Sequence, residues 1–259
     1  LYASHTGKVS DKWGLFLDVY DRLFASRRDR PVTLVEIGVQ NGGSLEIWPR
    51  YFADGVSFIG CDIDPACAAL VFDDPRVSVI VGNANSSAIH QAIRAKAPSW
   101  DIFIDDGSHT SQDIIATFCN YFHWLKPGGL HVVEDLHCSY WPQFGGGIWR
   151  GDSSMEFLKL LADIVNHGYW KDDASLDELL APFFPDSARP SAALFADVFS
   201  VTFYDSLCVV EKRAADQSPG LGARIVVGAE APVGRPSGRP APSGLARPAI
   251  DSVTHSCNS

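Results

Sequence analysis

Acidic side chains and a histidine follow two apolar runs, and they form the most reactive combination in the sequence. The first run ends in residues 102–110, IFIDDGSHT, and the second in residues 130–135, LHVVED. Carboxylates gathered in one place repel one another and raise their pKa values unless a cation offsets the charge, and oxygen ligands suit a hard divalent ion such as Mg²⁺. We therefore predict a metal site built from three side chains: Asp106, Glu134 and Asp135.

His109 stands three residues after Asp106, near the start of a predicted helix. The positive end of the helix dipole and a nearby metal ion both disfavour a protonated imidazole, so we expect His109 to be a neutral catalytic base. The structural alternative is that Asp106 caps the helix beginning near Ser108 and that Asp135 is merely solvated. We expect the neighbouring Asp105 to serve the strand end or the neighbouring backbone.

Apolar runs alternate with amphipathic segments of helix length along the chain. Strands are expected at Thr33–Val39, Val56–Ile63, Val77–Val81, Asp101–Ile104, Leu130–Glu134, Val198–Tyr204 and Leu207–Glu211. Helices are expected at Asp11–Ser26, Ser44–Phe52, Pro65–Val71, Ser86–Lys96, Ser111–Leu125 and Ser153–Asn166. Continuous apolar strands separated by helices indicate a parallel sheet covered on both faces. The last turn is too short for a crossover, so we predict a doubly wound, mostly parallel α/β sheet of seven strands with an antiparallel terminal hairpin.

A glycine-rich turn follows the first predicted strand, in residues 35–48, VEIGVQNGGSLEIW. Glycine lets a ligand approach the backbone closely, although a purely structural tight turn has the same composition. Asp62 ends the second strand, at the spacing where an acidic residue meets the hydroxyls of a cofactor ribose. Gln40 replaces the second glycine of a dinucleotide motif, and Glu36 lies within the strand. The turn therefore predicts an adenosine-type cofactor without a pyrophosphate.

Six motifs fall in order on these elements: VEIGVQNGG, GCDIDP, VGNANSS, FIDDGSH, WLKPGGLHVVED and FYDSLCVVEKR. Together they resemble class I S-adenosylmethionine-dependent methyltransferases over about residues 11–213, which implies a Rossmann-like fold and S-adenosylmethionine as the cofactor. In that family the glycine turn holds the methionine part of the cofactor, and the acidic residue after the second strand holds its ribose. Residues after the third strand contact its adenine. The resemblance thus implies these cofactor-binding residues: Gly38, Gly42, Asp62, Asn83 and Ala84. We also assign Glu36 and Asp105 to the cofactor site.

The acidic motifs make the resemblance more specific, because they are similar to those of metal-dependent O-methyltransferases. Metal-dependent O-methyltransferases of the catechol and caffeoyl-CoA types keep the same spacing of metal-binding acids, with lysine where this sequence has His109. The stretches DKWG, GGSLEIW, DDGSH and EDLHCSYWPQFGGG are also similar to bacterial methyltransferases of macrolide sugars and to cephalosporin-tailoring methyltransferases. The resemblance implies an Mg²⁺-dependent O-methyltransferase of antibiotic biosynthesis that acts on a hydroxyl of a glycosylated small molecule. A metal-independent enzyme, a cephalosporin-type enzyme and a non-catalytic S-adenosylmethionine-binding protein stay open as alternatives.

An aromatic and glycine-rich segment, residues 136–152, follows the second acidic pair. Its composition suits a lid over a large, partly apolar acceptor, or else an ordinary surface loop whose aromatic side chains pack on the core. We assign three side chains to the lid: His137, Tyr140 and Trp141. Near the N-terminus, residues 10–14, SDKWG, either begin a helix with Ser10 as its cap or fold over the cofactor, and the resemblance favours the second.

The composition of the chain limits the partners and the cellular location that we expect for the protein. The 259 residues have a net charge of −10 and no run of Lys and Arg of the kind that would neutralise a phosphate backbone, so nucleic-acid binding is not expected. No apolar segment is long enough for a membrane span, the pattern of a signal peptide is missing, and the six cysteines lack CxxC pairing, so we expect a cytoplasmic protein. The oligomeric state is left open, a homo-oligomer included.

Three regions follow from the composition along the chain. Residues 1–30 are expected to form an N-terminal helical segment, and residues 31–213 the catalytic domain. Residues 214–259 contain no aromatic side chain and are rich in Pro, Gly, Ala and Arg. Such a segment buries too little apolar area to order itself, so we expect a disordered tail.

Overall fold

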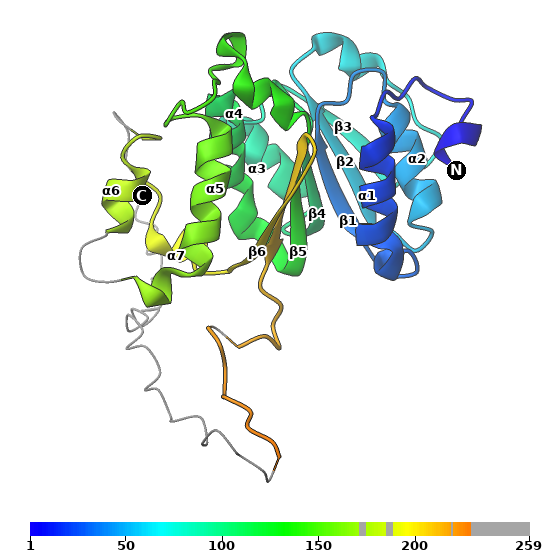
Figure 1. Cartoon of the computed structure of the whole chain (residues 1–259). Helices are drawn as coiled ribbons and strands as arrows, with labels where there is room; N and C mark the ends of the chain where they lie inside the picture. Colours follow the sequence, from blue (N-terminus) through cyan, green and yellow to red (C-terminus); the bar gives the residue numbers. More distant parts are fainter. Residues whose placement is uncertain (171–174, 185–188, 219, 229–259) are drawn as a thin grey trace, which may run out of the picture.

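The computed structural model describes residues 1–170, 175–184, 189–218 and 220–228 (Figure 1). Seven strands form one sheet in the order β3-β2-β1-β4-β5-β7-β6. They are β1 Thr33–Ile37, β2 Ser57–Asp62, β3 Val77–Val81, β4 Trp100–Asp105, β5 Leu125–Val133, β6 Val198–Tyr204 and β7 Leu207–Lys212. Strands β1 to β5 run parallel, whereas β7 is antiparallel to both β5 and β6. The predicted sheet and its terminal hairpin are confirmed.

Helices cover both faces of the sheet (Figure 1). The α-helices are α1 Gly14–Phe24, α2 Gly43–Tyr51, α3 Ser87–Lys96, α4 Ser111–Tyr121, α5 Ser154–Val165, α6 Leu176–Leu180 and α7 Ala192–Phe195. The short 3₁₀ helices are η1 Tyr2–Ser4, η2 Ala25–Arg27, η3 Pro65–Ala69, η4 Phe122–Trp124, η5 Leu136–Tyr140, η6 Pro142–Phe144 and η7 His167–Tyr169. Helices α1 and α2 pack on one face, and α3, α4 and α5 on the other.

Two apolar cores result, because successive strand residues point to opposite faces. In β4, Phe103 joins the core under α4 and α5, while Ile102 and Ile104 join the core under α1 and α2. Large side chains such as Phe118 and Phe157 are fully buried, and each contributes about 1.5 to 3 kcal/mol of hydrophobic stabilisation. These cores fix the strands whose ends carry the polar residues.

The observed elements depart from the predicted ones at three places. Helix α1 begins at Gly14 rather than residue 11, with Trp13 as its N-cap residue, so the alternative in which Ser10 caps it is wrong. Ser10 Oγ instead accepts a hydrogen bond from the Tyr2 hydroxyl at 3.0 Å. The segment from Pro65 forms only the 3₁₀ helix η3, capped by Asp64. Strand β5 begins at Leu125, five residues earlier than predicted.

His131 is buried within β5, and neither of its ring nitrogens has a hydrogen-bond partner in the described residues. Burial lowers the pKa of His131 to about 3.

The low pKa of His131 makes the stability of the protein depend on pH. Below the ordinary pKa of histidine, this residue binds a proton in the unfolded chain but not in the folded chain, so the protein loses stability as the pH falls towards 3. We expect His131→Phe, which keeps the stacking on Phe103, to raise the free energy of unfolding at pH 5 by about 2 kcal/mol. Urea unfolding at pH 5 and 7.5 measures this, and equal pH dependence in both proteins would contradict it.

No helix among the described residues is long and apolar enough to cross a membrane. Within residues 214–218 and 220–228 the chain forms neither helix nor strand. Most of the tail that the sequence predicts, residues 229–259, lies outside the described residues.

Candidate active site

The ends of three parallel strands meet at one edge of the sheet. Ile37 of β1 pairs with Asp105 of β4, which in turn pairs with Val133 of β5. The Asp106 amide donates to the Ile37 carbonyl at 2.9 Å. The Glu134 amide donates to the Asp105 carbonyl at the same distance, 2.9 Å. Because parallel strands end together, the acidic residues that follow β4 and β5 lie side by side.

A cavity of about 240 Å³ opens at this edge, between the glycine turn and the carboxylates. Gly38 lines it from the turn, and Asp106 lines it from the end of β4. Gly38 has a φ of 91°, and a Cβ there would lie 1.9 Å from the Asp106 carbonyl oxygen. Only glycine lets the two strand ends approach so closely. The glycine is thus required by the protein's own backbone.

Asp106, His109 and Asp135 form a cluster whose ligand atoms lie within 4.8 Å of one another. His109 Nε2 is 3.7 Å from Asp135 Oδ2. Both His109 and Asp135 have positive φ angles, 57° and 53°, which are uncommon outside glycine and often mark functional sites. Asp106 and Asp135 offer carboxylate oxygens, which suit a hard divalent cation, so this part of the predicted metal set fits such an ion, with His109 beside it.

Glu134 is turned towards protein partners. Its Oε1 accepts hydrogen bonds from Lys12 Nζ at 2.7 Å and from the Tyr20 hydroxyl. Lys12 Nζ also donates to Asp106 Oδ2 at 2.5 Å, and it lies 3.4 Å from Glu36 Oε1. The structure therefore places a lysine ammonium between carboxylates for which the sequence predicts a metal ion.

Burial and charge act against each other in this cluster. Burial raises the pKa of Asp106 and raises that of Glu134 to about 8, and the Lys12 ammonium opposes both shifts. Burial alone would lower the pKa of Lys12, but the charges of the surrounding carboxylates raise it well above its ordinary value. Lys12 therefore keeps its charge, and that charge favours the ionised forms of Asp106 and Glu134.

The loop that carries His109 is held from helix α4. Asp113 Oδ2 accepts hydrogen bonds from Ser108 Oγ at 2.5 Å and from Thr110 Oγ1 at 3.0 Å, the residues on either side of His109. Asn85 Nδ2 donates to the Asp113 carbonyl at 3.3 Å. These bonds keep His109 in its left-handed conformation. The sequence analysis did not identify Asp113 as a positioning residue.

An N-terminal strap, defined here as residues 8–13, crosses the glycine turn. The Gly43 amide donates to the Val9 carbonyl at 3.1 Å, and a Cβ on Gly43 would lie 2.4 Å from that oxygen. Glu46 anchors the strap through the Lys8 amide at 2.7 Å. The cavity is bordered by Gly43, whereas the predicted Gly42, with a φ of 84°, caps α2 and packs under Phe72.

Asp62 lies at the end of β2, where the sequence predicts a ribose contact. Its Oδ2 accepts hydrogen bonds from the amides of Val39 and Gln40 at 2.7 and 2.9 Å, and its Oδ1 accepts one from Asp64 at 2.9 Å. Although partial burial opposes it, these amide bonds lower the pKa of Asp62. Asp62 therefore stays ionised and ties the glycine turn to β2, and Oδ1 retains a lone pair for a ligand hydroxyl.

The other predicted cofactor residues lie around the same edge. Asn83 is exposed just after β3, and its Oδ1 accepts from the Asn85 amide at 2.8 Å. Ala84 is buried, and its carbonyl accepts from the Tyr121 hydroxyl at 2.7 Å. Glu36 is buried between Ser44 Oγ and Trp48 Nε1, at 2.8 and 2.9 Å from its Oε2.

Asp105 is buried beneath the turn and does not line the cavity. Burial raises its pKa to about 7.

The raised pKa of Asp105 makes the stability of the protein depend on pH. Between about pH 4 and pH 7, Asp105 keeps its proton in the folded protein but has lost it in the unfolded chain, so stability falls as the pH rises through this range. We expect Asp105→Asn, which has no charge to bury, to lessen this fall and raise the melting temperature at pH 8. Thermal unfolding at pH 4.5 and 8 is the measurement, and a lower melting temperature of the variant at pH 8 would contradict the expectation.

The predicted lid borders the cluster through its first residues. His137 Nδ1 lies 3.8 Å from Asp135 Oδ1 and forms a hydrogen bond of 2.6 Å with Ser206 Oγ. Tyr140 and Trp141 are 45% and 44% exposed, and their place in a lid remains a prediction. Trp13 of the strap, which the sequence analysis missed together with Lys12, donates from Nε1 to Asp135 Oδ1 at 3.1 Å.

Comparison with known proteins finds a matching family and relatives of similar sequence. Residues 35–136 match the family described as "Methyltransferase domain". The chain is 37% identical over 223 residues to 8-demethyl-8-alpha-L-rhamnosyl tetracenomycin-C 2'-O-methyltransferase of Streptomyces olivaceus, covering 82% of this chain and 54% of that protein. It is 32% identical over 214 residues to demethylmacrocin O-methyltransferase of Streptomyces fradiae, covering 79% of this chain and 51% of that protein.

A solved structure is similar in fold as well as in sequence. It is MycE methyltransferase from the mycinamycin biosynthetic pathway, in complex with Mg, SAH and mycinamycin VI, with a TM-score of 0.65 and 29% identity. The match covers 80% of this chain and 51% of that chain. The chain thus spans about half the length of the relatives that it matches.

Proposed function

We propose that this chain is a class I methyltransferase that transfers the methyl group of S-adenosylmethionine to a hydroxyl of a glycosylated small molecule, because its residues 35–136 match the family described as "Methyltransferase domain". The observation that carries the proposal is the cluster of Asp106, His109 and Asp135, within 4.8 Å, at the edge of the sheet beside the glycine turn. The name of the Streptomyces olivaceus relative, which contains a rhamnosyl group, supports a sugar hydroxyl as the acceptor.

His109 is proposed as the base that removes the proton of the acceptor hydroxyl. Its Nε2 faces Asp135 Oδ2 at 3.7 Å, and a nearby carboxylate stabilises the imidazolium that forms when Nε2 takes the proton. The positive φ of His109 and the bonds from Asp113 fix the ring's position. A base held in place in this way lowers the entropic cost of the reaction.

A divalent cation, with Mg²⁺ as the expected ion, is proposed at Asp106 and Asp135, with Glu134 close by. It would supply Lewis acidity that lowers the pKa of the acceptor hydroxyl. S-adenosylmethionine would supply the methyl group, with Asp62 on the ribose and Gly38 beside the methionine part. The strap, which lines the cavity from Val9 to Trp13, would limit the access of water to the cavity.

Methyl transfer to a panel of acceptors tests the proposed function. We expect label from methyl-labelled S-adenosylmethionine to reach glycosylated polyketides but not their sugar-free aglycones. Label on β-lactams or catechols alone would contradict the sugar acceptor. If calorimetry showed no heat when S-adenosylmethionine is added to the folded protein, a non-catalytic scaffold would replace the enzyme.

One observation favours a second candidate, a metal-independent methyltransferase. Lys12 Nζ lies between Asp106 and Glu134, so a protein cation already offsets part of their charge. In that case His109 would act without Lewis acid assistance. Metal removal separates the two candidates.

A further inference from the structure

Lys12 competes with the proposed metal ion for one carboxylate. Only 5% of its side chain is exposed, and its Nζ lies 2.5 Å from Asp106 Oδ2 and 2.7 Å from Glu134 Oε1. A divalent cation at Asp106 would need that carboxylate as a ligand. Because two cations in a poorly solvated site repel each other strongly, the ammonium and the metal cannot both stay against the same oxygen.

Glu36 offers the ammonium a second position. Its Oε1 lies 3.4 Å from Lys12 Nζ, is fully buried, and accepts no hydrogen bond from the described residues. Its Oε2 is already used, since it accepts from Ser44 and Trp48. A buried carboxylate oxygen without a partner is costly, so the ammonium gains a hydrogen bond by moving the short distance to Oε1.

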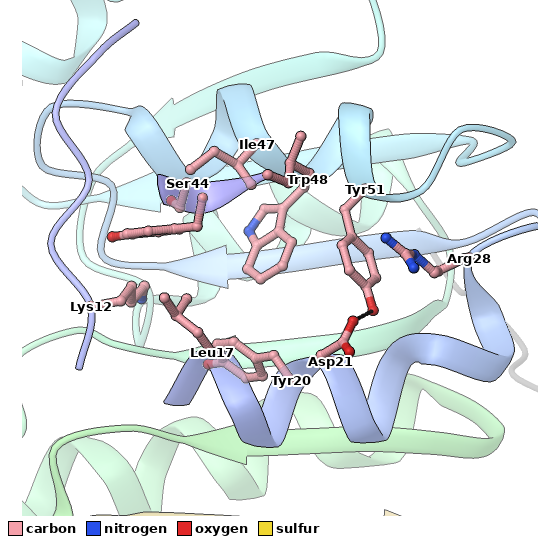
Figure 2. Close-up of a pocket in the computed structure, with 11 residues that line it drawn as sticks. Lys12, Leu17, Tyr20, Asp21, Arg28, Ser44, Ile47, Trp48 and Tyr51 are labelled. Carbon is pink, nitrogen blue, oxygen red and sulfur yellow. Dashed lines mark hydrogen bonds between the residues drawn. The ribbon is translucent and has the colours of Figure 1, made fainter. Parts of the chain in front are cut away.

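The surroundings of Lys12 leave room for this movement. Lys12 borders both the active-site cavity and a neighbouring cavity of about 210 Å³ between α1 and α2. Figure 2 shows Lys12 at one end of the neighbouring cavity, with Tyr20 on one side and Ser44 and Trp48 on the other. The long, flexible lysine side chain can therefore move while the strap stays anchored on Gly43.

We propose that Lys12 is an exchangeable internal cation, whose ammonium neutralises Asp106 and Glu134 without metal and moves to Glu36 when a divalent cation binds. The inference rests on the metal part of the proposed function. Lys12 then keeps the buried carboxylates compensated in the metal-free protein and sets the affinity for the metal.

Binding of Mn²⁺, followed by the loss of the free-ion electron paramagnetic resonance signal, tests the exchange. Lys12→Met removes the competing charge and is expected to bind Mn²⁺ about tenfold more tightly than the wild type. Glu36→Gln removes the second position and is expected to bind it more weakly. The double variant should match Lys12→Met, because no ammonium then needs a new partner.

Lys8→Met is the matched control, since Lys8 lies in the same strap but pairs with Glu46. It should bind Mn²⁺ like the wild type, and Lys12→Arg, which keeps the charge, should not bind more tightly. Equal or weaker binding by Lys12→Met would overturn the exchange alone. No Mn²⁺ binding by any of the proteins would overturn the proposed metal site and the exchange with it.

A measurement on the wild type covers the case in which Lys12→Met does not fold. With ¹⁵N-labelled lysine, the buried Lys12 ammonium should give an NMR signal that shifts on addition of Mg²⁺, whereas that of Lys8 should not. A Lys12 signal that stays in place while Mg²⁺ binds would contradict the exchange.

Discussion

His109→Asn is expected to lower kcat for methyl transfer by about a thousandfold, because the variant has no group that can take the proton of the acceptor. Asparagine is chosen because His109 has a φ of 57°, a left-handed conformation that asparagine tolerates better than alanine. The Kd for S-adenosylhomocysteine, measured by calorimetry, should stay close to that of the wild type. The two measurements separate a lost base from a lost cofactor site.

His123→Ala is the control for this prediction. His123 is exposed in η4, away from the cavity, and its substitution should leave kcat unchanged. If His109→Asn kept wild-type kcat, or lost cofactor binding instead of turnover, His109 would not be the base.

Asp106→Asn is expected to abolish Mn²⁺ binding and to lower kcat/KM by about a thousandfold, which corresponds to about 4 kcal/mol of transition-state stabilisation. Asp106 lies in the cluster with His109 and Asp135, and it also bonds to Lys12. An amide keeps the size of the side chain but removes its charge. Electron paramagnetic resonance and steady-state kinetics would measure the two effects.

Asp101→Asn is the matched control on the same strand. Asp101 lies at the opposite end of β4, where its Oδ2 accepts from the Thr33 amide and from Lys126 Nζ, both at 2.8 Å. Its substitution should affect stability but not metal binding. Wild-type Mn²⁺ affinity in Asp106→Asn would remove Asp106 from the metal site.

The sheet and the meeting of the acidic residues could be predicted from the sequence. Apolar strands alternating with helices leave few arrangements, and parallel strands end at one edge, so Asp106 and Glu134 had to lie close together. Helix bounds were less predictable at the chain's start. Residues 11–13 have a helical pattern, but the contact of the strap with Gly43 holds them in an extended path.

The partners of the carboxylates could not be predicted. Lys12 lies 94 positions from Asp106 and 122 from Glu134 in the sequence, and no local pattern links them. The stretch SDKWG raised the prospect of a segment over the cofactor, yet only the structure assigns its lysine to the carboxylates and its Trp13 to Asp135. The role of Asp113 depends likewise on where the turn before α4 brings Ser108 and Thr110.

Asp105 and Asp106 differ in their position relative to the cavity, as the spacing of Asp106 to His109 suggested. Asp106 lines the cavity, whereas Asp105 is buried beneath the turn. Successive side chains at a strand end point to opposite sides, which gives this difference a simple physical cause. The assignment of Asp105 to the cofactor remains a prediction.

Metal dependence of methyl transfer tests the central claim most directly. The wild-type protein is treated exhaustively with EDTA, passed into metal-free buffer, and assayed with labelled S-adenosylmethionine and a glycosylated acceptor. We predict that activity is lost and that Mg²⁺ restores it, because Asp106 and Asp135 then hold their cation beside His109. Full activity after EDTA treatment, without any increase on adding Mg²⁺, would contradict the claim and leave Lys12 as the site's only cation among the described residues.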